Sequence, residues 1–320
     1  MLDRFGRNID YLRVSVTDRC NLRCIYCMPV KEENWLRHSD ILRFEEILRI
    51  CALVTELGIT KIKVTGGEPL VRRGVTGLIA NLKKIRGIEF VSLTPNALVL
   101  DEHLSELIDA GIDAINISLD TLNEATFKQI TRNDNFNRVL QTLQKVLDTN
   151  LNIKINCVPI AGVNDADIVP LALLAKENNI AIRFIELMPL GYASGLPFAG
   201  QEKIIKMLEN EFGTLIPLHK NLGNGPAEYF TAAGFKGCIG FISALSHVFC
   251  SKCNRLRLTG AGLLRTCLSS ETGFDLKQVL RSGGSNDVIK NLICEAVNQK
   301  PERHTFSQSH KTTNMFRIGG

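Results

Sequence analysis

Short runs rich in Val, Ile and Phe alternate with longer amphipathic stretches along the first 190 residues. The short runs predict strands at 11–17, 61–65, 90–94, 114–118, 152–158 and 181–186. Helical spacing of apolar residues predicts helices at 43–57, 75–86, 101–110, 135–149 and 166–178. A strand, helix, strand order implies parallel pairing with right-handed crossovers. The chain is therefore expected to form an α/β fold, a curled sheet or incomplete (β/α)6 TIM-like barrel.

Residues suited to chemistry follow these strands, where the active site of such a barrel lies. A stretch with three cysteines, "TDRCNLRCIYCMPV", follows the first strand. "TGGEPL" (65–70), "TPNA" (94–97), "SLDT" (118–121) and "ELMPLG" (186–191) follow later strands. We expect all of these segments to meet at one end of the sheet.

Composition excludes several classes of protein. The chain has 320 residues, 45% apolar and 22% charged, which is typical of a globular protein with a sizeable core. A net charge of +5 is too weak to indicate nucleic-acid binding. No apolar run is long enough to span a membrane, and the N-terminal stretch does not resemble a secretion signal. We therefore expect a cytoplasmic protein in which the ten cysteines are thiols or metal ligands.

The alternating pattern ends near residue 190. Residues 1–190 are predicted to form the partial barrel, and residues 191–320 an extension packed onto it. Loops are expected at 190–200 and 221–229, and most of the stretch 301–320 is expected to be mobile.

The first cysteine group consists of Cys20, Cys24 and Cys27, with the spacing C-x3-C-x2-C. Structural zinc usually takes four protein ligands. Three thiolates on a [4Fe–4S] cluster would leave one iron open to a small molecule. A chance grouping of small buried residues is the third interpretation.

The second cysteine group consists of Cys250, Cys253 and Cys267, with the spacing C-x2-C-x13-C. A zinc site completed by His247 or Cys238 is one interpretation. A second three-ligand iron–sulfur cluster is the other, and its open iron could bind a substrate atom.

Basic residues accompany the second cysteine group. Arg255 and Arg257 alternate on a predicted strand, so both lie on one face. Two guanidinium groups on one face suit a bidentate anion site, although a solvated strand edge would look the same. Arg13, Lys63 and Lys154 supply further cations on other strands.

The first cysteine group resembles the signature of the radical S-adenosylmethionine (SAM) enzymes, with Tyr26 at the usual aromatic position. In that superfamily the open iron binds the amino and carboxylate groups of SAM. "TGGEP", which includes Gly67, resembles the superfamily's GGE motif. By this resemblance Tyr26, Gly67, Ser118 and Met188 are SAM-binding residues.

The chain as a whole resembles the MoaA family, the GTP 3′,8-cyclases of molybdenum-cofactor biosynthesis. The blocks that match are "YLRVSVTDRCNLRCIYCMP", "KVTGGEPLVRR", "INISLDTL", "RFIELMPLG" and "CNRLRLTG…LRTCL". Gly319 and Gly320 resemble the family's double-glycine tail, which reaches toward the active site. The resemblance implies two [4Fe–4S] clusters, SAM as cofactor, and a C-terminal extension that carries the second cluster.

The resemblance also implies the reaction. A 5′-deoxyadenosyl radical would remove the C3′ hydrogen of GTP, and ring closure on C8 would give 3′,8-cyclo-7,8-dihydro-GTP. The second cluster would bind the guanine. The residues that match GTP-binding positions are Arg13, Lys63, Thr94, Lys154, Arg255 and Arg257. No catalytic residue is expected beyond these and the cluster ligands, and no GxxxxGK[ST] phosphate loop is present. An electron donor and a downstream MoaC-like, pyranopterin-forming enzyme are the implied partners, and a homodimer stays open.

Two segments depart from the family pattern. The segment Thr94-Pro95-Asn96-Ala97 stands where the family usually has T-T-N-G. Pro95 removes a backbone donor, and Ala97 resists the positive φ that glycine accepts. Gly260-Ala261-Gly262 replaces A-D-G, which predicts a looser turn between the second and third ligands of the second group.

Two alternatives remain open from the sequence. One is another radical SAM enzyme with an auxiliary cluster, such as a peptide-modifying maturase. The other is a non-catalytic scaffold with zinc at both cysteine groups. Cys51 and Cys157 are interpreted as buried small residues, and Cys238 and Cys294 have no assigned role.

Overall fold

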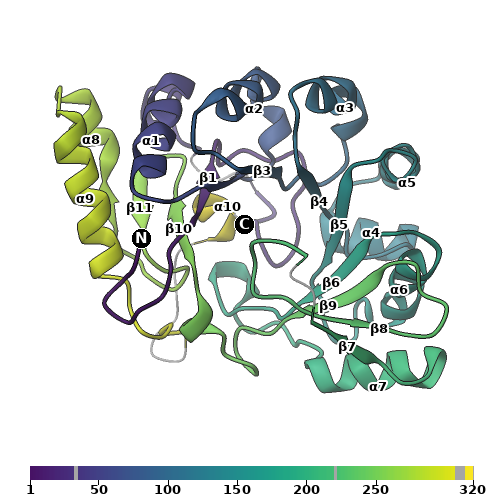
Figure 1. The fold of residues 1–320 in the computed structure, drawn as a ribbon. Coiled ribbons are helices and arrows are strands. Elements are labelled where there is room, and N and C mark those ends of the chain that lie inside the picture. Colours follow the sequence, from purple (N-terminus) through teal and green to yellow (C-terminus); the bar gives the residue numbers. More distant parts are fainter. Residues whose placement is uncertain (32–34, 220–221, 307–313, 320) are drawn as a thin grey trace.

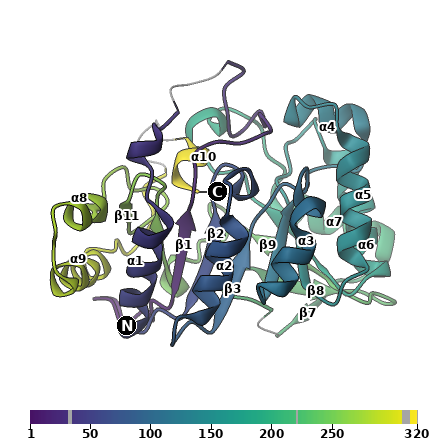
Figure 2. The ribbon, with the colours of Figure 1, turned by 90° about the horizontal axis from the view of Figure 1, so that it is seen from above.

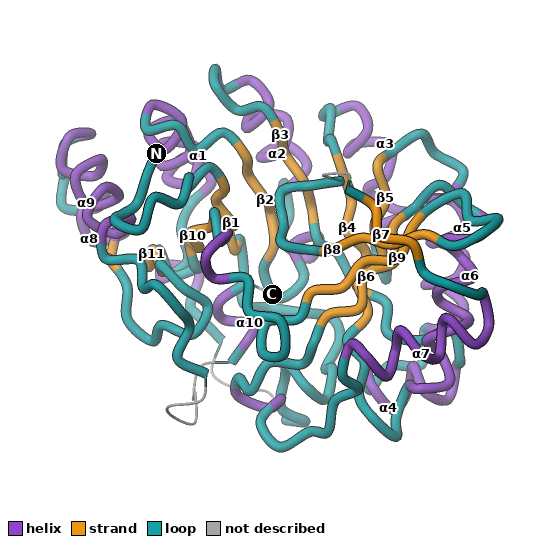
Figure 3. Tube along the Cα trace, turned by 60° about the horizontal axis from the view of Figure 1, so that its bottom comes forward, coloured by secondary structure: helices purple, strands orange, loops and turns teal. Residues whose placement is uncertain are grey.

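The protein is built around one curled sheet. Its structure, a computed structural model, describes residues 1–31, 35–219, 222–306 and 314–319. The sheet has twelve strands in the order β12-β11-β10-β1-β2-β3-β4-β5-β6-β9-β8-β7. Figures 1 and 3 show the strands curving around a central space without closing into a full barrel.

The six predicted parallel strands form the middle of this sheet, which confirms the expected incomplete barrel. They are β1 (Tyr11–Ser15), β2 (Lys61–Thr65), β3 (Phe90–Leu93), β4 (Ala114–Ser118), β5 (Asn152–Cys157) and β6 (Ala181–Ile185). The crossover helices are α1 (Phe44–Glu56), α2 (Val75–Lys84), α3 (Leu100–Asp109), α4 (Glu124–Thr131), α5 (Phe136–Leu147) and α6 (Ile168–Glu177). These helices lie outside the strands (Figure 2). All five predicted helices are present, whereas α4 was not predicted.

Residues after 190 lengthen the sheet at both edges. The strand β9 (Cys238–Ile242) pairs parallel with β6, and β10 (Arg255–Leu258) pairs parallel with β1. Antiparallel strands continue outward on each side: β7 (Ile216–Leu218), β8 (Glu228–Thr231), β11 (Leu263–Arg265) and β12 (Phe274–Asp275). The remaining helices are α7 (Gln201–Phe212), α8 (Leu276–Arg281), α9 (Asn286–Asn298) and α10 (Met315–Ile318). Short 3-10 turns occupy η1 (His38–Asp40), η2 (Pro69–Val71), η3 (Asp165–Asp167), η4 (Gly191–Ala193) and η5 (Cys250–Lys252). Strands from both segments lie in this one sheet. The division of the chain into two domains at residue 190 therefore stays a prediction.

The core lies between the sheet and the outer helices. Ile47 and Val54 of α1 and Leu12 of β1 are fully buried and belong to one apolar cluster. Each such side chain contributes about 1.5–3 kcal/mol relative to exposure. Cys51 and Cys157 are also fully buried, as the sequence predicted.

The N-terminal segment connects the two ends of the chain. Arg7 forms a buried ion pair with Asp3 at 2.6 Å. Its guanidinium also donates to the backbone carbonyl oxygens of Cys250 at 2.9 Å and Pro301 at 2.8 Å. This single side chain therefore joins the first residues to the second cysteine group and to the segment after α9.

The prediction that most of 301–320 is mobile is wrong for two described parts. Residues 301–306 are held by contacts such as the one between Arg7 and Pro301. The helix α10 lies within the curve of the strands in Figures 1 and 3, and its Phe316 is buried against Trp35 with ring centroids 5.8 Å apart. Residues 307–313 and 320 lie outside the described residues. Across the part of the chain that is described, no helix is both long and apolar enough to cross a membrane.

Candidate active site

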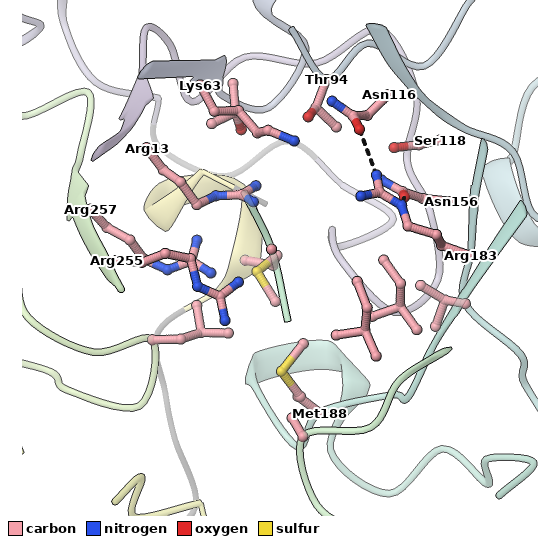
Figure 4. Close-up of a pocket in the computed structure, with 18 of the residues that line it drawn as sticks. Arg13, Lys63, Thr94, Asn116, Ser118, Asn156, Arg183, Met188, Arg255 and Arg257 are labelled. Atoms are coloured by element: carbon pink, nitrogen blue, oxygen red, sulfur yellow. Dashed lines mark hydrogen bonds between the residues drawn. The ribbon is translucent and has the colours of Figure 1, made fainter. Parts of the chain in front are cut away.

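The space inside the curved sheet forms one cavity that collects every predicted site residue. It is lined by Arg13, Cys20, Cys24, Tyr26, Cys27, Lys63, Gly67, Thr94, Ser118, Lys154, Met188, Cys250, Cys253, Arg255, Arg257 and Cys267. Because β10 pairs with β1, segments more than 200 residues apart in the sequence line the same side of the cavity. Figure 4 shows the basic side chains pointing into this space.

A row of cations crosses three neighbouring strands. Arg257 of β10 pairs in register with Arg13 of β1, which pairs with Lys63 of β2. Arg255, two residues before Arg257, lies on the same face of β10. Burial and the neighbouring cations lower the pKa values of Lys63 and Arg257 well below their ordinary range. An incoming polyanion would relieve this repulsion, so the charges of the row suit an anionic ligand.

Arg183 on β6 lines the same cavity but was not predicted as a site residue from the sequence. Its Nη2 donates to Asn116 at 2.6 Å and its Nε donates to Asn156 at 2.9 Å (Figure 4). These two bonds fix the orientation of a guanidinium that is almost fully buried. A charged residue in the middle of the apolar strand "AIRFI" was the signal that could have identified it.

Lys154 completes a basic patch, defined here as Arg13, Lys63, Lys154, Arg183, Arg255 and Arg257. Burial and the nearby charge of Arg183 lower the pKa of Lys154 to about 8. Lys154 is therefore poised to change charge near neutral pH, and a bound anion would favour its protonated form.

The loop of the first cysteine group is attached to α4. The backbone N–H groups of Arg23 and Ile25 donate to the carbonyl oxygens of Thr131 and Ile130, each at 2.9 Å. These bonds orient the turn that carries the three thiols into the cavity.

The sulfur atoms themselves receive hydrogen bonds. Leu22 N–H and the Asn96 amide lie 3.4 and 3.7 Å from Cys20 Sγ. Burial raises the pKa values of the Cys20 and Cys27 thiols to about 12. Three half-buried thiols on one loop, with N–H donors to the Cys20 sulfur, fit the ligand set of an iron–sulfur cluster.

Tyr26 is anchored by Asp120, which was not among the predicted site residues. Its hydroxyl donates to Asp120 Oδ2 at 2.7 Å, and Val158 N–H donates to Asp120 Oδ1 at 2.8 Å. Burial raises the pKa of Asp120 to about 6. This contact connects the first cysteine loop to the ends of β4 and β5.

The glycines of the "TGGEP" segment permit two backbones to touch. A Cβ atom on Gly67 would lie 2.4 Å from the carbonyl oxygen of Arg19. Glu68 N–H donates to that same oxygen at 2.8 Å, and the Glu68 carboxylate accepts from Asn96 N–H at 2.7 Å. The segment therefore holds the residue before Cys20 in place.

The altered segment after β3 adopts the conformation that the sequence made doubtful. Ala97 is buried and has a φ of 68°, in the left-handed region that glycine prefers. Pro95 still contributes its carbonyl oxygen, which accepts from Ser118 N–H at 2.9 Å. Thr94 lines the cavity as predicted, so the segment keeps its place at the cost of backbone strain.

The second cysteine group gathers from two places on the extension. Cys250 and Cys253 lie at η5 before β10, and Cys267 follows β11, where its Sγ is 3.3 Å from Ser269 Oγ. Burial opposes ionisation of Cys253, but Arg255 and Lys300 outweigh it and lower its pKa to about 6. A thiolate with nearby cations suits a metal cluster. Within residues 1–31, 35–219, 222–306 and 314–319, no three Cys, His, Asp or Glu side chains form a group that could hold a metal ion.

The turn at Gly260-Ala261-Gly262 closes without an aspartate. Gly262 N–H donates to Thr259 O at 2.9 Å, and Leu263 N–H donates to Thr259 Oγ1 at 3.0 Å. The expected loosening is therefore wrong, because Thr259 supplies the side-chain acceptor.

The C-terminal tail reaches this cavity. Arg257 Nη1 donates to the carbonyl oxygen of Gly319 at 2.8 Å. Gly319 has a φ of 87°, and a Cβ there would lie 2.8 Å from Ser15 Cβ, so the position requires glycine. Gly320 lies outside the described residues.

The chain is similar to known radical SAM proteins and to proteins of molybdenum-cofactor synthesis. Residues 14–175 match the Radical SAM superfamily, and residues 180–306 match Molybdenum Cofactor Synthesis C. A GTP 3′,8-cyclase of Desulforamulus reducens is 44% identical over the full length of both chains. One from Thermodesulfovibrio yellowstonii is 44% identical over 94% of this chain and 95% of that protein.

The chain belongs to the GTP 3′,8-cyclase family. It is a radical SAM enzyme, and members of this family act in molybdenum-cofactor synthesis. A solved structure of Streptococcus suis SuiB bound to its precursor peptide SuiA has a TM-score of 0.62 at 12% identity, covering 95% of this chain and 76% of that one. That likeness shows the fold alone, so it does not support a peptide substrate here.

Proposed function

We propose that this chain converts GTP to 3′,8-cyclo-7,8-dihydro-GTP with SAM and two [4Fe–4S] clusters, one on each cysteine group. When bound, SAM and the first cluster supply a 5′-deoxyadenosyl radical that removes the C3′ hydrogen of GTP. The chain's own residues bind, orient and enclose the reactants.

SAM would lie between the first cysteine group and the ends of β2, β4 and β6. Gly67 permits close approach of backbone, while Ser118 and Met188 line the same end of the cavity. Tyr26 is fixed by Asp120, so its backbone next to Cys27 presents one defined surface.

GTP would lie between the second cysteine group and the basic patch. The triphosphate carries about four negative charges and needs several cations in a confined site. The row Arg257, Arg13 and Lys63 supplies them from one side, and Arg183 supplies a fixed guanidinium from the other. Thr94 adds a polar contact beside Lys63.

The observation that carries the proposal is the meeting of two three-cysteine groups and this basic patch in one cavity. A site for SAM alone would not need the patch, and a zinc scaffold would not need the cavity. An electron donor, a MoaC-like enzyme for the product and a homodimer belong to this proposal as expectations.

The test is anaerobic incubation of the reconstituted protein with GTP, SAM and a reductant. We expect 5′-deoxyadenosine, the cyclised nucleotide and about eight irons per chain. The variant with Cys250, Cys253 and Cys267 replaced by serine should keep about four irons and lose the nucleotide product. Zinc at both groups, or turnover of peptides but not of GTP, would contradict the proposal.

A further inference from the structure

Lys300 is a buried cation to which the sequence assigned no role. It follows the end of α9 and is 2% exposed. Removing an ammonium group from water costs several kcal/mol unless other groups replace its hydration. Its position therefore requires an explanation from its surroundings.

Two backbone carbonyl oxygens accept hydrogen bonds from this ammonium. Its Nζ donates to Thr266 O at 2.6 Å and to Arg255 O at 2.9 Å. An ammonium has three donors and no acceptor, so two of its three donor positions are occupied by backbone oxygens. These bonds tie Lys300 to the protein backbone, whereas the basic patch faces the proposed triphosphate.

These acceptors bracket the second cysteine group. Arg255 lies two residues after Cys253, and Thr266 immediately precedes Cys267. One side chain therefore ties together the two segments that carry these cysteines. The same side chain lines the cavity together with Cys253 and Cys267.

We propose that Lys300 is a positioning residue that holds the second cysteine group and sets the reduction potential of the cluster bound there. This inference rests on the proposed function, because it requires a cluster at that group. A buried positive charge beside a cluster favours the more negative, reduced state. Loss of Lys300 should therefore make the second cluster harder to reduce.

The test compares Lys300→Gln and Lys300→Arg with the parent protein, each reconstituted anaerobically. Glutamine keeps N–H donors but no charge, whereas arginine keeps the charge. The matched control is Lys252→Met, which removes a charge next to Cys253 from an exposed side chain. Iron content and an EPR-monitored redox titration are measured, with the first cluster as internal reference.

We expect Lys300→Gln to shift the reduction equilibrium of the second cluster at least tenfold toward the oxidised form, about 59 mV for one electron. Lys300→Arg should shift it less, and Lys252→Met should resemble the parent. An unchanged potential in Lys300→Gln with full iron content would overturn the inference, as would an equal shift in Lys252→Met.

A second measurement applies if Lys300→Gln does not assemble its second cluster. The parent protein, labelled with ¹⁵N at lysine Nζ, is reduced and studied by pulsed EPR. We expect a ¹⁵N coupling at the second cluster, and its absence would overturn the inference. Failure of the proposed function would appear separately, as a parent protein with only four irons or with zinc.

Discussion

Replacing Gly67 with alanine tests whether close backbone contact positions the first cysteine group. The new Cβ would lie 2.4 Å from Arg19 O and 2.7 Å from Asp18 O, whereas ordinary contact begins near 3.4 Å. The loop before Cys20 must therefore move by 3.4 − 2.4 = 1.0 Å. Overpacking of this kind costs about 1–3 kcal/mol, offset by about 0.4–1 kcal/mol from the stiffer unfolded chain. We expect a net loss of about 1–2 kcal/mol in the free energy of unfolding.

Gly77→Ala is the matched control, because it lies exposed within α2 and a Cβ there meets nothing within 4 Å. Alanine in a helix interior should stabilise the protein by about 1 kcal/mol. The two variants should thus shift Tm in opposite directions, by about 2 °C per kcal/mol. Misplacing a reacting group by about 1 Å costs on the order of 100-fold in rate. Gly67→Ala should lose that much 5′-deoxyadenosine formation while Gly77→Ala loses none, and equal Tm values and rates in the two variants would refute the reasoning.

Three further predictions concern the cavity. Because the pKa of Lys154 is lowered to about 8, its charge is lost as pH rises above 8, so GTP affinity should fall by up to about tenfold per pH unit there. Lys154→Met should bind GTP more weakly and without that slope in anaerobic calorimetry; a slope that persists would contradict this assignment. Ala97→Gly should leave Tm nearly unchanged, since relief of about 1–2 kcal/mol of strain is offset by loss of a buried methyl group and a more flexible unfolded chain. Ala97→Val should lower Tm clearly, and a stable valine variant would disprove the positive φ. Tyr26→Phe removes the hydroxyl that donates to buried Asp120, which should cost about 1–3 kcal/mol in thermal unfolding of the apoprotein, and an unaltered Tm would show that this bond contributes nothing.

The central strands and the site were predictable because their signals are local. The strand β4 (AINIS) contains two Ile residues and is buried at four of its five positions, so its sequence identifies it without knowledge of its neighbours. The cysteine spacings and the alternating Arg255 and Arg257 are likewise short-range patterns. The structure places all of these residues in one cavity.

What the sequence did not predict depends on long-range contacts. Periodicity identifies β10 as a strand but cannot show that it pairs with β1, more than 200 residues away. Arg183 and Lys300 are single charged residues whose meaning lies in partners on other elements. At Ala97 the sequence predicted backbone strain, because alanine resists a positive φ. It did not predict that the folded protein would nevertheless keep Ala97 at a φ of 68°.

The contacts of Arg7 determine when the second cysteine group can be held in place during translation. Its partners at Cys250 and Pro301 do not yet exist when the first strands emerge, and neither does Lys300. The hydrogen bonds that hold the first cysteine loop to Glu68, Asn96 and α4 involve only the first 131 residues. The backbone contacts of Arg7 and Lys300 that hold the second cysteine group form only when almost the whole polypeptide has been translated. A ribosome-bound nascent chain that ends before residue 300 should therefore hold the second cysteine group less firmly than the first.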